Sequence, residues 1–278
     1  MAIQKEIKTP KVLIIGAVLV GFWVLVAIFA DVIAPFDPNG TSGDDAYKSY
    51  MHQNAEGGVH ILGTDKLGRD ILSRVIYGAR FVLLYASLAT FVAYIIGVSM
   101  GLIAGYFRGR VDMVMSFVAN LVLSFPIVVV YILVASTFSK SAFSIFFAVV
   151  FASSPAIYRI VRGLTMDICT RDYIAAAETR GSHPLYVMFV EILPNARGPL
   201  IVDSCLRIGY TTIQLGFLAF IGLGLSPQQP DWGQMIKDYL PEIIGNQYMI
   251  LSPIGALISL VLGLNLLADG LREKSLQD

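Results

Sequence analysis

The chain has 278 residues, of which 56% are hydrophobic and only 14% are charged, and its mean hydropathy is +0.70. Soluble domains carry about 25% charged residues, and here the apolar residues gather in long blocks, so the composition predicts an integral membrane protein. A formal net charge of zero gives no sign of a nucleic-acid-binding surface.

The first apolar block, residues 12–35, lies close to the N-terminus. It follows Lys5, Lys8 and Lys11, an arrangement that also begins a secretory signal peptide. Its apolar run is longer than about twenty residues, and no small-residue cleavage site precedes Pro35. A first span that stays in the mature protein is therefore the better interpretation.

Six segments in all are long enough to cross about 30 Å of hydrocarbon at about 1.5 Å per residue. They lie near residues 12–34, 81–106, 113–138, 142–163, 198–224 and 248–268. Lys and Arg are more frequent on the side of the N-terminus, so the positive-inside rule places both termini in the cytoplasm. The sequence thus predicts an all-α membrane protein with six transmembrane helices.

Two longer loops then lie outside the cytoplasm. In the first, "GTDKLGRD" (63–70) has the glycine spacing of a phosphate-binding loop but lacks its Lys and Ser or Thr, so we expect no nucleotide site there. The basic segment 68–80 is expected to form a helix at the membrane surface, either as an anchor or as a contact for another protein. In the second loop, Trp232 and Tyr239 are candidates for interfacial aromatic residues.

Between the fourth and fifth spans, a half-polar loop at 171–195 predicts a short helix on the cytoplasmic side. Asp172 begins it, three alanines favour it, and Gly181 can take the left-handed conformation that ends it. The side chains offered to a partner are Ala175, Ala176, Ala177 and Glu178. Small side chains let another backbone approach closely, although an ordinary surface helix has the same composition.

A second short helix is expected after this glycine. Ser182 or His183 can cap it, and Pro184 fits its first position, where a missing N–H costs nothing. Pro194 is expected to end it, and its apolar side chains suit packing against the bundle.

The fifth span contains charged residues. Asp203 and Arg207 stand four residues apart, so they share a helix face and can pair. Tyr210 and Gln214 continue the polar character along the same span. Charged side chains are costly in a bilayer, so this face predicts either a wall of a translocation path or a structural ion pair near the cytoplasmic end.

The loop at 171–195 resembles the EAA loop of binding-protein-dependent ABC importer permeases. That pattern reads Glu-Ala-Ala, three residues, Gly, about nine residues, then Ile-x-Leu-Pro. The matching residues here are Ala176, Ala177, Gly181, Leu193 and Pro194. Two positions depart from it: Ala175 stands where Glu is usual, and Ile192 directly precedes Leu193.

Four further segments resemble the dipeptide, oligopeptide and nickel branch of that family, specifically its C-type subunit. They are "HILGTDKLGRDILSRVIYGAR" (60–80), "GLIAGYFRGRVD" (101–112), "FIGLGLSPQQPDWGQMI" (220–236) and "NLLADGLRE" (265–273). The resemblance implies a type I ABC importer permease fold. It divides the chain into an N-terminal region (1–75), a permease domain (76–270) and a cytoplasmic tail (271–278).

The resemblance also implies a role and a set of partners. The first loop helix is expected to couple the permease to a cytoplasmic ATPase, and the membrane bundle to transport by alternating access. The expected partners are a second permease subunit, two ATPase subunits that bind ATP and Mg²⁺, and an extracytoplasmic substrate-binding protein. The chain itself is then a transport subunit of a prokaryotic inner membrane, with no catalytic residues, cofactor or metal of its own.

Substrate and rival functions stay open at this level. Peptides, nickel chelates, glutathione and oligosaccharides are all carried by similar importers, and nothing in the spans selects among them. The alternative is an ion-coupled secondary transporter, for which Asp203 and Arg207 are the candidate ionisable groups. A membrane-embedded enzyme would need a cluster of nucleophile, base or metal ligands, and the sequence suggests none.

Overall fold

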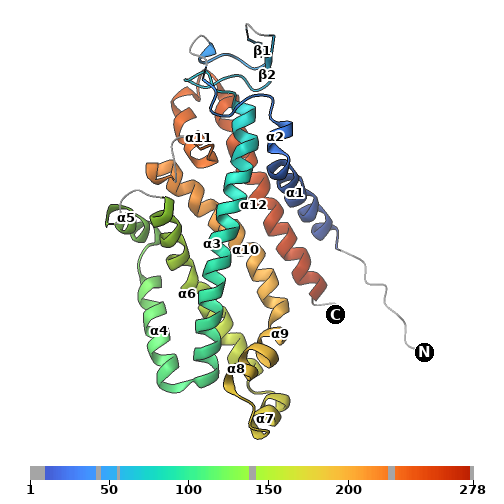
Figure 1. Ribbon diagram of the computed structural model, residues 1–278, viewed down its shortest axis with the longest axis vertical. Helices are drawn as coiled ribbons and strands as arrows, with labels where there is room; N and C mark the ends of the chain where they lie inside the picture. The colour runs from blue at the N-terminus through green and yellow to red at the C-terminus, as the bar shows by residue number, and fades with distance from the viewer. Residues whose placement is uncertain (1–9, 42–44, 55–56, 138–141, 225–228, 276–278) are drawn as a thin grey trace, which may run out of the picture.

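Helices make up most of the molecule, which is an elongated bundle with two differently built ends (Figure 1). The computed structural model describes residues 10–41, 45–54, 57–137, 142–224 and 229–275. Helix α7 (Asp172–Thr179) lies at one end, and the hairpin of β1 (His52–Gln53) and β2 (Val59–His60) lies at the other. These are called here the α7 end and the hairpin end.

Within the described residues, five helices are long and apolar enough to cross a membrane. They are α1 (Lys11–Ile28), α3 (Ile71–Phe107), α6 (Ala142–Ile168), α10 (Arg197–Leu218) with its π-helical continuation η3 (Ala219–Leu223), and α12 (Gln247–Ser275). A single helical turn, α2 (Ala30–Ile33), follows α1 after a break at Phe29. The prediction of a multi-span all-α membrane protein is confirmed in this form.

The expected third span, near 113–138, is not one straight helix. It consists of α4 (Gly109–Ser124) and α5 (Ile127–Thr137), which meet at 89°. The break falls at Phe125 and Pro126, because proline lacks an N–H for the helix ladder and pushes the preceding residue into extended backbone. Phe125 is extended, with ψ of 139°. The described chain therefore has five candidate spans, or six if this bent pair counts as one.

Helix α3 begins ten residues earlier than the expected span at 81–106. Asp70 caps it by accepting a hydrogen bond from the Ser73 N–H at 2.7 Å, and Ile71 in its first turn is fully buried. The basic segment 68–80 is thus mostly the first part of α3 and not a separate helix on the membrane surface. The first turns of α3 are buried in the apolar cluster that α3 shares with α1, α11 and α12. At about 1.5 Å per residue α3 is about 55 Å long, which exceeds the thickness of the hydrocarbon.

Two apolar clusters fill the bundle, and α3 belongs to both. One cluster joins α3 to α6, α10 and the segment that contains α7. The other joins α3 to α1, α12 and α11 (Trp232–Tyr239), a short helix near the hairpin end. Because α3 connects the two clusters, it acts as the central element of the subunit.

Helices α3 and α6 approach each other at three glycines of α3. Gly97, Gly101 and Gly105 stand four residues apart, a spacing that favours close packing of membrane helices. A Cβ atom added at these positions would lie 2.6–2.7 Å from side-chain carbons of Ile157, Val161 and Thr165, respectively. The lack of a Cβ atom at these three glycines therefore sets how closely α3 and α6 can approach each other.

Candidate functional site

Helix α7 is the outermost element at its end of the molecule (Figure 1). It ends as the sequence predicts, with Gly181 in the left-handed region at φ of 77°. The N–H of Gly181 donates to the Glu178 carbonyl at 2.9 Å, and the N–H of Ser182 donates to the Ala177 carbonyl at 3.1 Å. This pair of bonds is a Schellman motif, which satisfies carbonyls that a helix end leaves free.

The three alanines do not share one face of α7. Ala175 and Ala176 are exposed, whereas Ala177 is fully buried and packs inward together with Ile174. Consecutive helix residues point about 100° apart, so one of three must turn away from any flat surface. The small face available to a partner is therefore centred on Ala175 and Ala176.

Glu178 holds α7 against the bundle. Its side chain is exposed, yet its carboxylate interacts with the hydroxyl group of Tyr106, near the end of α3. Asp172 lies in the first turn of α7, where its negative charge interacts favourably with the helix dipole. The N-cap residue is Arg171, and no side chain caps the helix there.

The second helical stretch of this loop differs from its prediction at its end. It runs through α8 (Pro184–Tyr186), the π-helical turn η2 (Val187–Ile192) and α9 (Leu193–Asn195). His183 caps it, since its Nδ1 accepts from the Leu185 N–H at 3.3 Å. Pro194 lies inside α9 and does not end the stretch.

A change in hydrogen bonding explains why Pro194 is tolerated. The N–H of Leu193 donates to the carbonyl of Met188, five residues back, which is the spacing of a π-helix. Proline then takes a position in the following turn, where its missing N–H removes little.

The expected ion pair in α10 is present, and it has a third member. The Asp203 carboxylate accepts from Arg207 Nε at 3.3 Å and from the hydroxyl of Tyr94, which belongs to α3. Both charged side chains are largely buried. The pair therefore joins α10 to α3, a contact that the spacing within α10 alone does not indicate.

Tyr210 and Gln214 lie in different surroundings. Tyr210 is 53% exposed, and its neighbours Ile213 and Phe217 on the same side of α10 are exposed as well. Gln214 is part-buried, and its Oε1 accepts from the Tyr131 hydroxyl of α5 at 2.8 Å. The four predicted residues are thus divided between an exposed stripe and contacts between helices.

A cavity of about 500 Å³ opens beside Asp203 between α6, α10 and α12. Asp203 lies seven residues, or about two helical turns, before Tyr210, so both residues are on the same side of α10. The cavity therefore continues the exposed stripe toward the α7 end. The residues that line it are Ile160, Pro199, Val202, Asp203, Leu206, Asp269 and Arg272. Two charged residues of α12 therefore join the polar end of this surface.

At the hairpin end, a cluster of buried charged residues holds the loop before α3. Asp65 accepts from the backbone N–H of Arg69 at 3.1 Å and pairs with its guanidinium at 2.6 Å. Asp70 lies 2.9 Å from the ring of His60, and Arg74 donates to a backbone carbonyl of the preceding loop at 3.0 Å. The segment with phosphate-loop spacing therefore has a structural role, because Asp65 pairs with Arg69 and Asp70 pairs with His60.

The aromatic residues of α11 also differ from their prediction. Trp232 and Tyr239 were candidates for interfacial aromatics, yet both are buried. Trp232 donates its ring N–H to the Val75 carbonyl at 2.9 Å and contacts Trp23 edge to face. These side chains pack α11 against α1 and α3, so they lie inside the protein and are not exposed aromatics of a membrane interface.

Asp231 caps this helix from inside the protein. Its carboxylate accepts from the Gly233 N–H at 2.8 Å, and burial raises the pKa of the carboxyl group to about 6. The charge of the loop between α10 and α12 near pH 6 thus depends on the Asp231 carboxyl group, which no sequence motif indicated.

Comparisons with known proteins identify the family. The family described as "Binding-protein-dependent transport system inner membrane component" matches residues 97–275, which is well over half of the chain. A second family, described as the N-terminal TM domain of oligopeptide transport permease C, matches residues 6–54. The chain belongs to the binding-protein-dependent transport permeases.

Relatives and a solved structure agree with this assignment. The dipeptide transport system permease protein DppC of Escherichia coli K12 is 35% identical over 266 residues, which cover 96% of this chain and 89% of that protein. The glutathione transport system permease protein GsiD of Pectobacterium atrosepticum is 32% identical over 262 residues, which cover 92% and 85%. An inward-facing MetNI methionine ABC transporter has a similar fold, with a TM-score of 0.62, 18% identity, and coverage of 73% and 97%.

The resemblance noted in the sequence is confirmed by these matches. The chain is a multi-span permease subunit of an ABC transport system in the inner membrane. The alternative of an ion-coupled secondary transporter has no support. Asp203 and Arg207 instead form the ion pair described above, with Tyr94 as a third partner.

Proposed function

We propose that this permease forms half of the translocation path of an ATP-driven importer, with six spans and both termini in the cytoplasm. The second half would come from another permease subunit, and two cytoplasmic ATPase subunits would bind ATP and Mg²⁺. An extracytoplasmic binding protein would deliver the solute. The observation that carries this proposal is the position of α7 at one extreme of the molecule, with Ala175 and Ala176 exposed.

In this proposal α7 is the contact with an ATPase subunit. Its exposed alanines let another backbone approach closely, while Ile174 and Ala177 bind the helix to the bundle core. Glu178 interacts with Tyr106, so a push on α7 reaches α3 directly. Helix α3 contacts both apolar clusters, which gives a physical route from the ATPase to the whole bundle.

The exposed stripe of α10 is proposed as this subunit's wall of the path. Tyr210 lies at its centre, and Asp203 lies near the cavity at its α7 end. Two conformations that open this surface to opposite sides would provide alternating access. The proposed solute is a peptide, because relatives named for dipeptides and for glutathione align with most of the chain.

The decisive experiment replaces Ala176 with a large charged residue. The permease is purified with its accompanying subunits, and ATPase recovery is compared between wild type, Ala176→Arg and Ala176→Ser. Because Ala176 is exposed, neither change disturbs the core. We expect Ala176→Arg to lose most of the ATPase while the membrane subunits stay together, and Ala176→Ser to retain it.

Equal recovery of the ATPase with both variants would show that α7 is not the contact. The position is better suited to this test than Gly181, because a side chain there is strained by the positive φ whatever it contacts. A loss at Gly181 could arise from the shape of the loop, whereas a loss limited to Ala176→Arg requires a nearby partner.

A further inference from the structure

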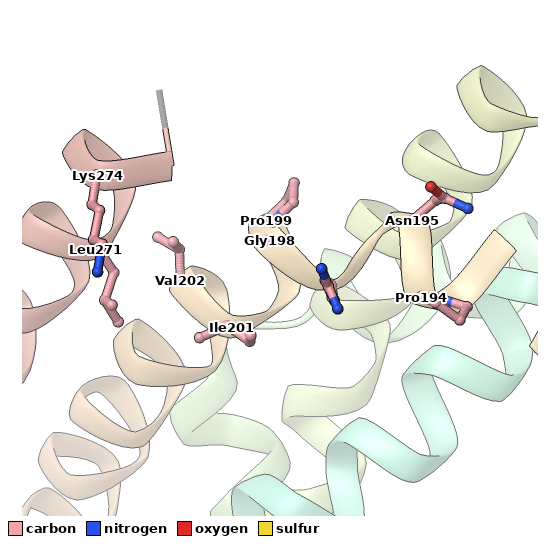
Figure 2. A pocket seen from close by; sticks show the side chains of 9 residues that line it. Pro194, Asn195, Gly198, Pro199, Ile201, Val202, Leu271 and Lys274 are labelled. Carbon is pink, nitrogen blue, oxygen red and sulfur yellow. The ribbon is translucent and has the colours of Figure 1, made fainter. Parts of the chain in front are cut away.

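A groove of about 520 Å³ lies at the α7 end between the start of α10 and the end of α12. Figure 2 shows its two walls, with Leu271 and Lys274 from α12 on one side and Pro199, Val202 and Ile201 from α10 beside them. The described residues that line it are Pro194, Asn195, Arg197, Gly198, Pro199, Ile201, Val202, Leu271 and Lys274.

The charge of this groove is of one sign. Arg197 and Lys274 are exposed cations, and none of its nine described lining residues carries a carboxylate. The span of α10 begins at Arg197, and the span of α12 ends at Lys274. Both cations therefore lie at the end of a helix that is long and apolar enough to cross a membrane, and cations near such ends attract anionic lipid headgroups.

A second groove of about 370 Å³ shares part of this lining and is mostly apolar. Pro194, Arg197 and Ile201 line both grooves, so the two adjoin along these residues. The second groove continues along Phe189, Leu193 and Leu200, beside Tyr94. Phe189 is exposed in the described chain, as are Tyr186 and Val190 of the same helical stretch.

We propose that the joined grooves bind one anionic phospholipid. The phosphodiester group would lie between Arg197 and Lys274, and an acyl chain would lie in the apolar groove along Phe189 and Leu200. A phosphate needs cations, and an acyl chain needs a dry surface that continues from them. The two grooves place the cations next to such an apolar surface, whereas a soluble anion would contact only the cations.

The site has a structural consequence for the permease. The segment that contributes Phe189 and Pro194 follows α7 directly, and α10 carries the proposed wall of the path. A lipid in the joined grooves would contact α9, α10 and α12 at once. It would thus stabilise the connection between the α7 loop and the bundle, independently of whether α7 contacts an ATPase.

The test uses the full-length chain purified with its accompanying subunits in mild detergent. Native mass spectrometry measures the binding of dioleoyl phosphatidylglycerol, of dioleoyl phosphatidylcholine with the same chains, and of glycerol phosphate without chains. We expect phosphatidylglycerol to bind most tightly. The double variant R197Q/K274Q should bind it about twenty-five-fold more weakly, because each of the two cations contributes about fivefold in affinity for an anionic lipid.

Two matched variants separate this site from general charge effects. R110Q/R180Q removes two exposed cations outside the groove and should bind phosphatidylglycerol like wild type. R197K/K274R keeps both charges and should retain most of the binding, which controls for misfolding of the double glutamine variant.

Three results would overturn the proposal. Equal binding of phosphatidylcholine would show that the cations are irrelevant, and equal binding of glycerol phosphate would show a simple anion site. If R197Q/K274Q binds lipid normally but loses the ATPase, the groove is a protein contact instead. The last result would leave the role of Ala176 untouched, so the two proposals can fail separately.

Discussion

At the scale of single residues, Asp231 is a buried carboxyl group outside the spans whose pKa is raised. The side chain is almost completely buried, and its main compensation is a backbone hydrogen bond from Gly233. Burial disfavours the charged carboxylate, so the pKa rises to about 6 from the usual value of 3.8. Keeping an N-cap carboxylate charged at neutral pH therefore lowers the stability of this loop.

Asp231→Asn should reveal this cost as a pH-dependent difference. Since the folded-state pKa is the higher one, the native protein holds the proton more tightly, and its stability falls as pH rises between about 4 and 6. Asparagine caps helices equally well and does not titrate. At pH 7 the variant should be more stable by about 3 kcal/mol, and near pH 4 by almost nothing.

Thermal unfolding of both proteins in detergent from pH 4 to 7.5 measures that difference. Other titrating groups contribute equally to the two curves and cancel. Curves that stay parallel over the whole range would show that Asp231 is charged at little cost.

At the scale of elements, the glycines of α3 decide how closely it packs on α6. In a bilayer there is no hydrophobic drive between helices, so association depends on shape and close contact. Gly101 faces the side chain of Val161 at a distance where a Cβ does not fit. Both helices are long, and this contact extends along much of the first apolar cluster.

Gly101→Ala should therefore separate the helices, although alanine is the better helix former. A Cβ at this position would lie 2.6 Å from Val161 Cβ and 3.0 Å from the backbone of Arg162, so backbone must move. We expect a loss of about 1–3 kcal/mol, as for other overpacked cores. Gly163→Ala on α6 is the control, because nothing lies within 4 Å of its added Cβ.

The control should leave stability unchanged or raise it by up to about 1 kcal/mol through helix propensity. Thermal unfolding of the purified permease measures both variants. If they behave alike, the approach of α3 and α6 is looser than the structure indicates.

At the scale of the whole molecule, the polar residues of α10 serve two purposes. Asp203 and Gln214 bind Tyr94 of α3 and Tyr131 of α5, so they connect α10 to its neighbours. Tyr210 is exposed between them along the helix. The whole bundle thus divides this helix into an inner side that holds the fold and an outer side that is free to contact a solute or a second subunit.

Tyr210→Ala and Gln214→Leu should therefore have different effects. Tyr210→Ala is expected to change the rate of peptide uptake severalfold with unfolding unaltered, because an exposed side chain adds little to stability. Gln214→Leu leaves the buried Tyr131 hydroxyl without its partner, so it should lower stability by about 1–3 kcal/mol. Uptake in proteoliposomes and thermal unfolding provide the two readouts.

Phe91→Ala on α3 is the matched control, since it also removes an exposed aromatic side chain from a span. Uptake that is normal in Tyr210→Ala, or reduced equally in Phe91→Ala, would remove Tyr210 from the proposed path.

The sequence alone determined the rough position of the apolar segments, the helix α7 with its glycine end, and the pairing of Asp203 with Arg207. These features depend on neighbours within a few residues, through helix periodicity, capping and spacing. Family membership was also visible in the residues, since motifs are spread along the whole chain. At α7, the local sequence was enough to predict how the helix ends, because Gly181 adopts the positive φ that the end requires.

The tertiary structure alone decided which faces are buried. Ala177 is buried because it shares the side of α7 on which Ile174 packs into the bundle, and Trp232 is buried because α1 and α3 meet around it. The early start of α3 has the same origin, since Arg69 and Arg74 become buried where Asp65 supplies their counter-charge. These contacts join residues far apart in the chain, so their free energy depends on how the helices pack. The sequence around each residue does not determine that packing.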